Sequence, residues 1–300
     1  MRRPDASSAM PFHVLIACHN RRELTSHAIT TFAAAATANG IDADFTVFDD
    51  GSTDGTPEAI AALGLPVTRI AGDGTAFWSR GMAEAEDHVL RVHHDDGYIV
   101  WLNDDVELDG DFLEVAIAAI KSVPSAVLVG AMRDPATGEL TYSAYRSVGF
   151  HPLRGDLLKP NGTLQSADTF CGNLVFVPMN IARAMDGIDG SLSHFGADTD
   201  YGLRLREKGL EIFLLPTTIG SCAPNPLRPV GPVLRDWRGF LDVKGGGNFN
   251  TLRQILRKQY PHTWLGYVAI TYLHWWARRL NHFPSCTSIA VHLQGRVGRL

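Results

Sequence analysis

Short apolar runs typical of β-strands alternate with helix-type segments through the first third of this chain, and this alternation restricts the fold more than any other feature. The strand-type runs are residues 12–17, 45–48, 67–70 and 98–102, and later runs follow at 126–131, 170–177 and 212–215. The first helix-type segments are residues 23–38, 56–63 and 77–92, the second with Thr56 as its expected cap. Strands joined by helices in this way pair in parallel. We therefore expect an α/β fold with a mostly parallel central sheet flanked by helices.

The charge distribution divides the chain near residue 225. The net charge is −5, yet residues 226–300 contain eleven Lys and Arg against two Asp. Residues 251–300 hold seven of these basic residues and no acidic one. We expect one α/β domain over residues 1–225 and a basic, aromatic-rich helical segment over residues 226–300 that meets an anionic surface.

The aromatic part of this segment leaves two interpretations open. Residues 262–277 are uncharged and rich in Trp and Tyr, but a run of this length is too short to span a bilayer comfortably. Aromatic residues followed by Arg278 and Arg279 suit a helix that lies on a membrane through residues 251–300. The alternative is a helix that packs against its own domain or against the second subunit of a homodimer.

Cysteine usage and the N-terminus bear on location. Cys18, Cys171, Cys222 and Cys286 lie far apart and form no C-x-x-C pair, which favours reduced thiols over disulfides or a zinc site. The first 12 residues carry two arginines without an apolar segment behind them, unlike a secretory signal. We expect a cytoplasmic protein that reaches, at most, the inner face of the cell membrane, and no nucleic-acid partner.

The segment IVWLNDDVEL, residues 99–108, places Asp104 and Asp105 at the end of an apolar run. Two adjacent carboxylates repel each other unless a positive group lies between them. Mg²⁺ or Mn²⁺ prefers carboxylate oxygens and in turn binds substrate phosphates, and open α/β sheets bind ligands at the carboxyl ends of strands. The alternative is a solvated turn, with Asp104 or Asp105 capping the helix expected near Asp111.

The loop FDDGSTDGT, residues 48–56, follows the second strand-type run. Its carboxylates can accept hydrogen bonds from a base or a ribose, and Gly51 lets a ring approach the backbone. The same residue types also suit the start of a capped helix, so the loop alone does not decide between a nucleoside site and a turn.

Four segments together resemble the family 2 glycosyltransferases with the GT-A fold. They are the strand end at 17–20, FDDGSTDGT at 48–56, NDDV at 103–106 and GADTDYGLRLREKG at 196–209, in this order. The resemblance covers about residues 12–222. WSRGM followed by WLNDDVEL is similar to a bacterial polysaccharide-assembly subgroup of this family. The resemblance implies that residues 1–225 form a GT-A catalytic domain.

The resemblance also implies roles for individual residues. Ala17 and Asp50 match the positions that flank the nucleotide base, with Asp50 hydrogen-bonding it. Asp105 matches the metal ligand of the DXD-type motif, on Mn²⁺ or Mg²⁺, and Asp104 matches a ribose contact. Asn103 stands where many members have the first Asp of that motif. The further nucleotide-binding positions are Asn20, Arg21, Gly51, Ser52, Trp78 and Gly81.

The segment GADTD matches the family pattern Gly-Glu-Asp-x-Asp, in which Asp198 corresponds to the catalytic base. Two departures accompany this match. Ala197 replaces the usual Glu, and Cys222 stands where many members have a metal- or phosphate-binding His. Asp200 and Arg204 lie four residues apart on one helix face, a spacing that also suits a simple ion pair.

The resemblance implies an inverting, metal-dependent glycosyltransferase with a nucleotide-sugar donor and a glycan or lipid-linked acceptor. In this chemistry a carboxylate takes the proton of the acceptor hydroxyl while the metal neutralises the leaving diphosphate. Two alternatives remain. A sugar nucleotidyltransferase would need an N-terminal Gly-rich loop with a basic residue, which FHVLIACHN lacks. A non-catalytic glycan- or nucleotide-binding module is compatible with Ala197 and the missing His.

Overall fold

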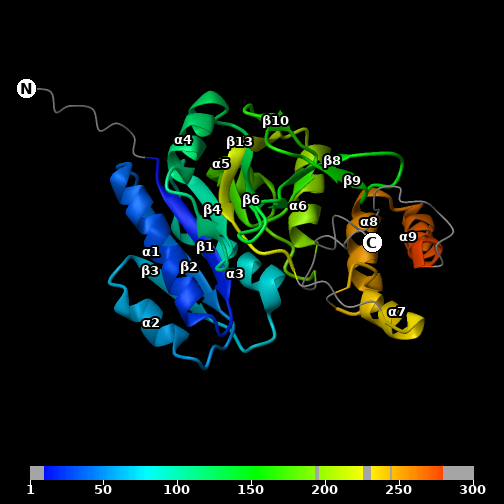
Figure 1. Ribbon diagram of the computed structural model, residues 1–300. Helices are drawn as coiled ribbons and strands as arrows, with labels where there is room; N and C mark the ends of the chain where they lie inside the picture. Colours follow the sequence, from blue (N-terminus) through cyan, green and yellow to red (C-terminus); the bar gives the residue numbers. More distant parts are fainter. Residues whose placement is uncertain (1–9, 193–195, 226–230, 244, 280–300) are drawn as a thin grey trace, which may run out of the picture.

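The protein forms a central mixed sheet with helices on both faces, and a group of C-terminal helices packs beside it (Figure 1). The computed structural model describes residues 10–192, 196–225, 231–243 and 245–279. In chain order the first half contains β1 (Phe12–Cys18), α1 (Arg22–Ala38), β2 (Ala43–Asp49), α2 (Thr56–Ala62), β3 (Val67–Ala71), α3 (Phe77–Val92), β4 (Tyr98–Leu102), β5 (Glu107–Leu108) and α4 (Phe112–Ser122). The second half contains β6 (Val127–Arg133), β7 (Leu140–Tyr142), β8 (Ala144–Ser147), β9 (Gly155–Leu157), β10 (Gln165–Ser166), β11 (Thr169–Phe170), β12 (Leu174–Pro178), α5 (Met179–Ala184), α6 (Ala197–Glu207), β13 (Ile212–Ser221), α7 (Val233–Leu241), α8 (Phe249–Gln259) and α9 (Trp264–Arg279).

The main sheet has the strand order β10-β13-β6-β12-β4-β1-β2-β3. β1 pairs in parallel with β2 and β4, and β2 pairs in parallel with β3. β12 is antiparallel to both β4 and β6, while β13 is again parallel to β6. The predicted α/β fold with a mostly parallel sheet is confirmed. Because β1, β2 and β4 run in one direction, their carboxyl ends meet at one edge of the sheet.

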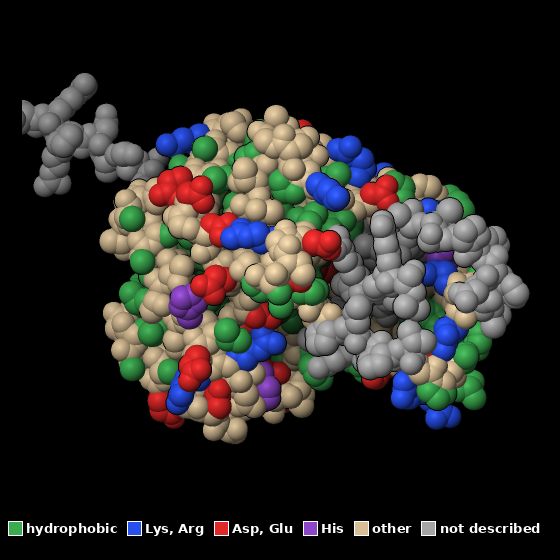
Figure 2. All heavy atoms as spheres, in the orientation of Figure 1, with side chains coloured by type: hydrophobic (Ala, Val, Ile, Leu, Met, Phe, Trp, Pro, Cys, Tyr) green, Lys and Arg blue, Asp and Glu red, His purple; other side chains and the backbone are tan. Residues whose placement is uncertain are grey.

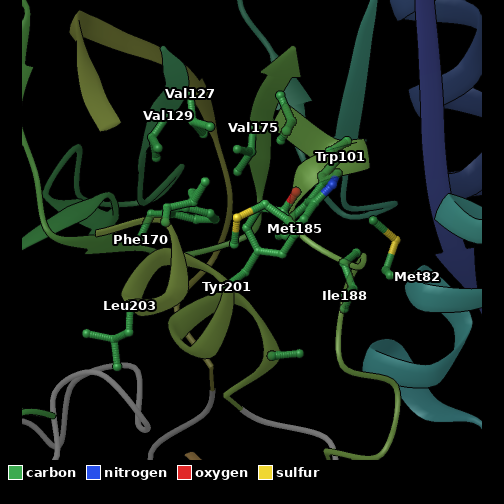
Figure 3. Close-up of a cluster of buried hydrophobic side chains, with 14 of the residues drawn as sticks. Met82, Trp101, Val127, Val129, Phe170, Val175, Met185, Ile188, Tyr201 and Leu203 are labelled. Atoms are coloured by element: carbon green, nitrogen blue, oxygen red, sulfur yellow. The ribbon is translucent and has the colours of Figure 1, made fainter. Parts of the chain in front are cut away.

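The strands at the centre of the sheet are buried on both faces, as their unbroken apolar sequences predict. Alternate residues of β4 therefore enter different layers of the core. Val100 and Leu102 pack with α1 and α4, whereas Trp101 packs with α6. The Trp101 ring centroid lies 4.9 Å from that of Tyr201 and 5.8 Å from that of Phe170 (Figure 3). This contact fixes the start of α6 against the end of β4.

Asp200 of α6 joins helix α8 to the α/β domain. Its carboxylate is 1% exposed and accepts hydrogen bonds from Arg204 Nε at 2.8 Å and from Lys258 Nζ of α8 at 2.9 and 3.0 Å. Lys258 also reaches Asp189 at 2.5 Å. A buried carboxylate needs such partners, since its charge is costly away from water. The ion pair of Asp200 with Arg204 is confirmed, and Lys258 extends it to a second helix.

The C-terminal helices share the core of the α/β domain. Leu252 and Leu256 of α8 belong to the same buried cluster as Trp101. α9 packs on α7, where Trp275 stacks on Phe240 with centroids 5.5 Å apart. The division of the chain at residues 225 and 226 stays a prediction, and residues 280–300 of the basic segment lie outside the described residues.

The cap predicted for α2 is wrong, and the alternative of a helix cap at Asp104 or Asp105 is excluded. Gly55, with φ of 87°, is the N-cap of α2, and Thr56 is already helical. Asp54 satisfies the helix start instead, because its Oδ1 accepts from Thr56 N at 3.1 Å. The N-cap of α4 is Asp111, and β5 separates α4 from Asp104 and Asp105. The acidic pair therefore does not cap that helix.

Glu86 on α3 makes stability depend on pH. Its carboxyl is fully buried, and burial raises its pKa from 4.5 to about 7 although Ile188 N donates to it. The unfolded chain releases this proton at lower pH, so the free energy of unfolding falls as pH rises from about 4.5 to 7. In the wild type this fall amounts to up to about 3 kcal/mol, and we expect Glu86→Gln to abolish it. The measurement is the free energy of unfolding in urea, compared between pH 5 and pH 8.

The matched control for this prediction is Glu84→Gln, on the same helix but paired with Arg80 at the surface. It should leave the pH dependence as in the wild type. If the free energy of unfolding falls equally with pH in the wild type and in Glu86→Gln, Glu86 is not the source of the pH dependence.

Candidate active site

The carboxyl ends of β1 and β2 are tied to each other by their own polar residues. Asn20 lies in the left-handed region with φ of 52°, and its backbone N–H donates to Ser52 Oγ at 2.8 Å. The Asn20 side-chain oxygen accepts from Thr53 N at 2.8 Å. Asn20 and Ser52, both predicted to bind the nucleotide, therefore hold the loops after β1 and β2 together.

Asp50 organises the loop that leads into α3. Its Oδ1 accepts from Gly74 N at 2.8 Å, and its Oδ2 accepts from Ala76 N and Phe77 N, both at 3.0 Å. The residue is 6% exposed. Gly51, with φ of 69°, follows it in the left-handed region that favours glycine. A nucleotide base could donate to the remaining lone pairs of the Asp50 carboxylate, which already accepts hydrogen bonds from three backbone amides.

Ala17 and Gly81 lie against each other where α3 crosses the sheet. A Cβ on Gly81 would stand 3.3 Å from the Ala17 Cβ and 2.9 Å from the Phe48 ring. Gly81 is thus required by the close approach of α3 to β1 and β2. The structure brings both residues next to Phe48, the last apolar residue before the loop that carries Asp50, and it gives Gly81 a packing role that the sequence did not show.

Arg21 supplies the positive group that the acidic pair needs. Its guanidinium donates to Asp104 Oδ1 at 2.8 Å and to Asp105 Oδ2 at 2.9 Å. Asp104 is buried, and burial together with Asp105 raises its pKa to about 6 against the opposing effect of Arg21. Asp104 Oδ2 is buried and has no hydrogen-bond partner among the described residues. An orphaned carboxylate oxygen of this kind calls for a ligand hydroxyl or a cation.

The donor atoms around Asp105 fit a hard divalent cation. Asp105 is 39% exposed, and with Asp104 it offers carboxylate oxygens at a strand end. Cys222 Sγ lies 3.6 Å from Asp105 Oδ1, at the position where many family members have His. Burial raises the pKa of the Cys222 thiol, which therefore stays protonated and is a poor ligand for Mg²⁺ or Mn²⁺. The remaining ligands would come from the phosphates of a bound substrate.

Asp198, in the first turn of α6, faces the same site. Its Oδ2 accepts from Gly172 N at 3.1 Å and its Oδ1 from Thr199 N at 2.7 Å. Burial raises its pKa to about 6. Trp78 lies next to it, because a Cβ on Gly172 would contact the Trp78 ring at 2.9 Å and the Asp198 Cβ at 3.4 Å. Trp78 Nε1 in turn donates to Asn103 Oδ1 at 2.8 Å, beside the acidic pair.

Residues 171–173 are part of the site, and sequence reasoning missed them. Residues 170–177 were expected as one strand, but the structure has β11 and β12 with a break between them. In this break Gly172 leaves room for Trp78, and Asn173 O accepts from Asn103 N at 3.0 Å. A glycine inside a strand pattern is the signal that indicates such a break.

A family model described as glycosyl transferase family 2 matches residues 13–177, which is more than half of the chain. The chain belongs to glycosyl transferase family 2. The matched segment contains the strand ends that carry Asp50 and the acidic pair, whereas Asp198 and the C-terminal helices lie beyond it. No curated protein sequence matches the chain.

Solved glycosyltransferase structures share the fold. Staphylococcus aureus TarS, residues 1–349, is 15% identical with a TM-score of 0.52, over 71% of this chain and 60% of that one. Its complex with UDP-GlcNAc is 13% identical with a TM-score of 0.53, over 82% and 66%. GalNAc-T7 with UDP, GalNAc and Mn²⁺ is 12% identical with a TM-score of 0.59, over 94% and 56%. At these identities the likeness shows the GT-A fold alone, and the chain spans about 60% of the length of the first of them.

Proposed function

We propose that this family 2 glycosyltransferase moves a sugar from a nucleotide-diphosphate donor to a hydroxyl of a glycan or lipid-linked acceptor, with inversion at the anomeric carbon. One observation carries the proposal: the half-buried Asp198 and the Asp104–Asp105 pair are joined through Gly172, Trp78 and Asn103 into one site. A base and a diphosphate-binding acidic pair at one sheet edge are the parts that a single displacement needs.

Asp198 is the proposed general base. A carboxylate with a pKa of about 6 is ionised near neutral pH and still basic enough to accept a proton from a hydroxyl as that oxygen attacks. Gly172 N and Thr199 N fix the carboxylate from two sides, so its orientation does not depend on substrate. Attack from the side opposite the leaving diphosphate inverts the anomeric configuration.

Asp105 would hold Mn²⁺ or Mg²⁺, and Asp104 Oδ2 would accept a ribose hydroxyl. The bound metal neutralises negative charge on the leaving diphosphate. Arg21 balances the acidic pair before substrate arrives, and its guanidinium matches the oxygens of a diphosphate in a bidentate way. We therefore place Arg21 on the donor phosphates, and Ala17, Asn20, Asp50, Gly51, Ser52, Trp78 and Gly81 around the base and ribose.

Release of nucleoside diphosphate from a panel of nucleotide sugars, with and without Mn²⁺, tests the activity. Slow release of nucleoside diphosphate that needs metal, and that an acceptor accelerates by taking the sugar in place of water, supports a transferase. Tight binding of a donor that stays intact under all conditions supports the non-catalytic binding module. Pyrophosphate release from a nucleoside triphosphate and a sugar phosphate supports the nucleotidyltransferase.

We further propose that the C-terminal helices bring the enzyme to the inner face of a membrane that carries a lipid-linked acceptor for polysaccharide assembly. None of the helices in the described part of the chain has the length and apolar character needed to cross a bilayer. Leu265, Ala269 and Leu273 are exposed at a four-residue spacing, which places them along one side of α9. Lys and Arg side chains gather at the same end of the molecule (Figure 2). An exposed apolar face with basic flanks suits the membrane interface.

The sequence predicts that the Trp and Tyr residues between 264 and 276 lie at the level of the lipid headgroups, and this stays a prediction. Two of the tryptophans also make contacts within the protein. In the structure Trp275 packs on Phe240, and Trp276 packs on Trp237 with ring centroids 5.3 Å apart. The exposed leucines of α9 are therefore the apolar groups that the proposal depends on.

We expect the protein to co-sediment with anionic vesicles and to dissociate as salt rises, because each basic residue near the surface contributes roughly 1 kcal/mol over a Debye length of about 8 Å. The double variant Leu265→Asp with Leu273→Asp should bind at least about tenfold more weakly. Leu24→Asp, at an exposed leucine of α1, is the control and should bind as the wild type does.

Absence of vesicle binding at low salt would contradict membrane association. If the double variant instead converts a dimer into a monomer in light scattering, the face of α9 belongs to a homodimer interface.

A further inference from the structure

A second polar cluster lies at the opposite edge of the sheet from the active site. His13 is the second residue of β1, Asp44 is the second residue of β2, and His93 and Asp95 belong to the connection from α3 to β4. At about 3.3 Å per residue, β1 separates His13 from the nucleotide loop by roughly 20 Å. The proposed glycosyl transfer uses none of these residues.

The cluster has the atoms of a metal site within reach of one another. One ring nitrogen each of His13 and His93 and one oxygen of Asp95 all lie within 4.8 Å of each other, the only such group among the described residues. His13 Nε2 is 3.2 Å from both Asp95 oxygens, and His93 Nδ1 is 3.9 Å from Asp95 Oδ2. Metal–ligand bonds of about 2 Å place the ligand atoms of a tetrahedral ion roughly 3.3 Å apart. His13 Nε2 and Asp95 already have such a separation, whereas the His93 ring, whose centroid is 3.8 Å from that of His13, must turn to bring its nitrogen closer.

Asp44 occupies the position of an outer-shell partner. Its Oδ2 lies 2.7 Å from His13 Nδ1, which leaves Nε2 of the same ring directed at Asp95. A carboxylate that accepts from one nitrogen of a histidine fixes the ring and raises the basicity of the other nitrogen, a usual arrangement behind zinc ligands. His13 is almost fully buried, so its ring has little freedom to turn elsewhere.

The surrounding chain holds the cluster in place and leaves it open to solvent. Arg183 of α5 donates to the backbone oxygens of His93 and Asp95 at 3.2 and 3.1 Å. Gly97 N donates to Asp95 Oδ1 at 2.8 Å. The side chains of His93 and Asp95 are 30% and 36% exposed, so an ion can enter from solution.

We propose that His13, His93 and Asp95 bind one Zn²⁺, with Asp44 as the outer-shell partner of His13 and water as the fourth ligand. Two imidazole nitrogens and one carboxylate suit Zn²⁺ rather than the Mg²⁺ or Mn²⁺ expected in the active site. The ion would join β1 to the connection between α3 and β4 and so stabilise the sheet edge. Without a metal, the same residues form only an ion-pair network in which Asp44 and Asp95 flank His13.

The test is calorimetric titration of the chelator-treated full chain with ZnCl₂. We expect one site with micromolar or tighter affinity and a rise in melting temperature, because an ion that binds the folded state stabilises it by mass action. His93→Ala and Asp95→Asn should weaken binding at least about 100-fold, and Asp44→Asn by about 10–100-fold. Co²⁺ in place of Zn²⁺ should give the visible absorption of a tetrahedral site.

The neighbouring residues provide matched controls. His94→Ala and Asp96→Asn alter exposed side chains next to the proposed ligands and should bind Zn²⁺ as the wild type does. Asp105→Asn should also leave this titration unchanged, which separates the site from the active-site metal. No binding, or binding that His93→Ala leaves intact, would overturn the proposal in favour of the ion-pair network.

Discussion

Replacing Asp198 with Asn is expected to lower sugar transfer by roughly 10²–10⁴-fold while nucleotide-sugar binding survives. The amide keeps the shape of the carboxylate but cannot take the proton of the acceptor hydroxyl. It also turns an NH₂ group toward either Gly172 N or Thr199 N, where the carboxylate accepts a hydrogen bond. The measurement is initial transfer rate together with donor affinity and melting temperature, so that a local disturbance is distinguished from loss of the base.

The pH profile gives a second readout of Asp198. A base must be deprotonated, and burial raises the pKa of this carboxyl to about 6, so wild-type transfer should rise with pH through about 6 and then level off. Asp186→Asn, the same change at an exposed loop residue, should leave both rate and profile unchanged. A loss of donor affinity equal to the loss of rate in Asp198→Asn would assign Asp198 to binding or structure.

Replacing Asp105 with Ala is expected to lower turnover by about 10³-fold or more, because a metal on the leaving group contributes several kcal/mol to the transition state. The variant also frees the guanidinium of Arg21 from one of its two carboxylates. Metal-dependent donor binding should disappear because the proposed metal ligand is gone, even though Arg21 stays in the site paired with Asp104. Initial rates and donor affinity with Mn²⁺ and with excess chelator measure the effect.

Asp111→Ala, at the N-cap of α4 and outside the site, is the control and should keep its metal dependence. Full activity of Asp105→Ala, or of the wild type in excess chelator, would contradict the proposal that Asp105 binds a catalytic metal ion. Arg21 would then be the cation that stabilises the diphosphate.

The parts of the site that follow from local sequence were predictable. Apolar runs that stop at polar residues place Ala17, Asp50 and Asp104 at strand ends, and the parallel pairing of β1, β2 and β4 brings these ends together. The sequence also showed that the acidic pair needs a positive neighbour. It could not show that this neighbour is Arg21, 83 residues away, because the contact exists only after β1 and β4 pair.

Other features of the site depend on packing between distant segments, which the spacing of apolar residues along the chain does not reveal. The break at residues 171–173 serves the ring of Trp78, which comes from a distant helix. The hydrogen bonds of Asp50 to the loop before α3 and of Asp200 to Lys258 likewise join segments far apart in the chain. From the sequence, the aromatic residues near the C-terminus suit a membrane contact and a protein contact equally well. In the structure Trp275 and Trp276 pack against Phe240 and Trp237 of α7.

The most direct measurement of the central claim is a thermal-shift screen of nucleotide sugars with Mn²⁺ on the wild type, Asp198→Asn and Asp105→Ala. A true donor stabilises the folded protein by mass action, by about 2.7 kcal/mol at 100 times its dissociation constant. We predict that one nucleotide sugar raises the melting temperature of the wild type and of Asp198→Asn in a dose-dependent way but does not shift Asp105→Ala. No shift with any nucleotide sugar, or an equal shift in all three proteins, would contradict a donor site built on the acidic pair.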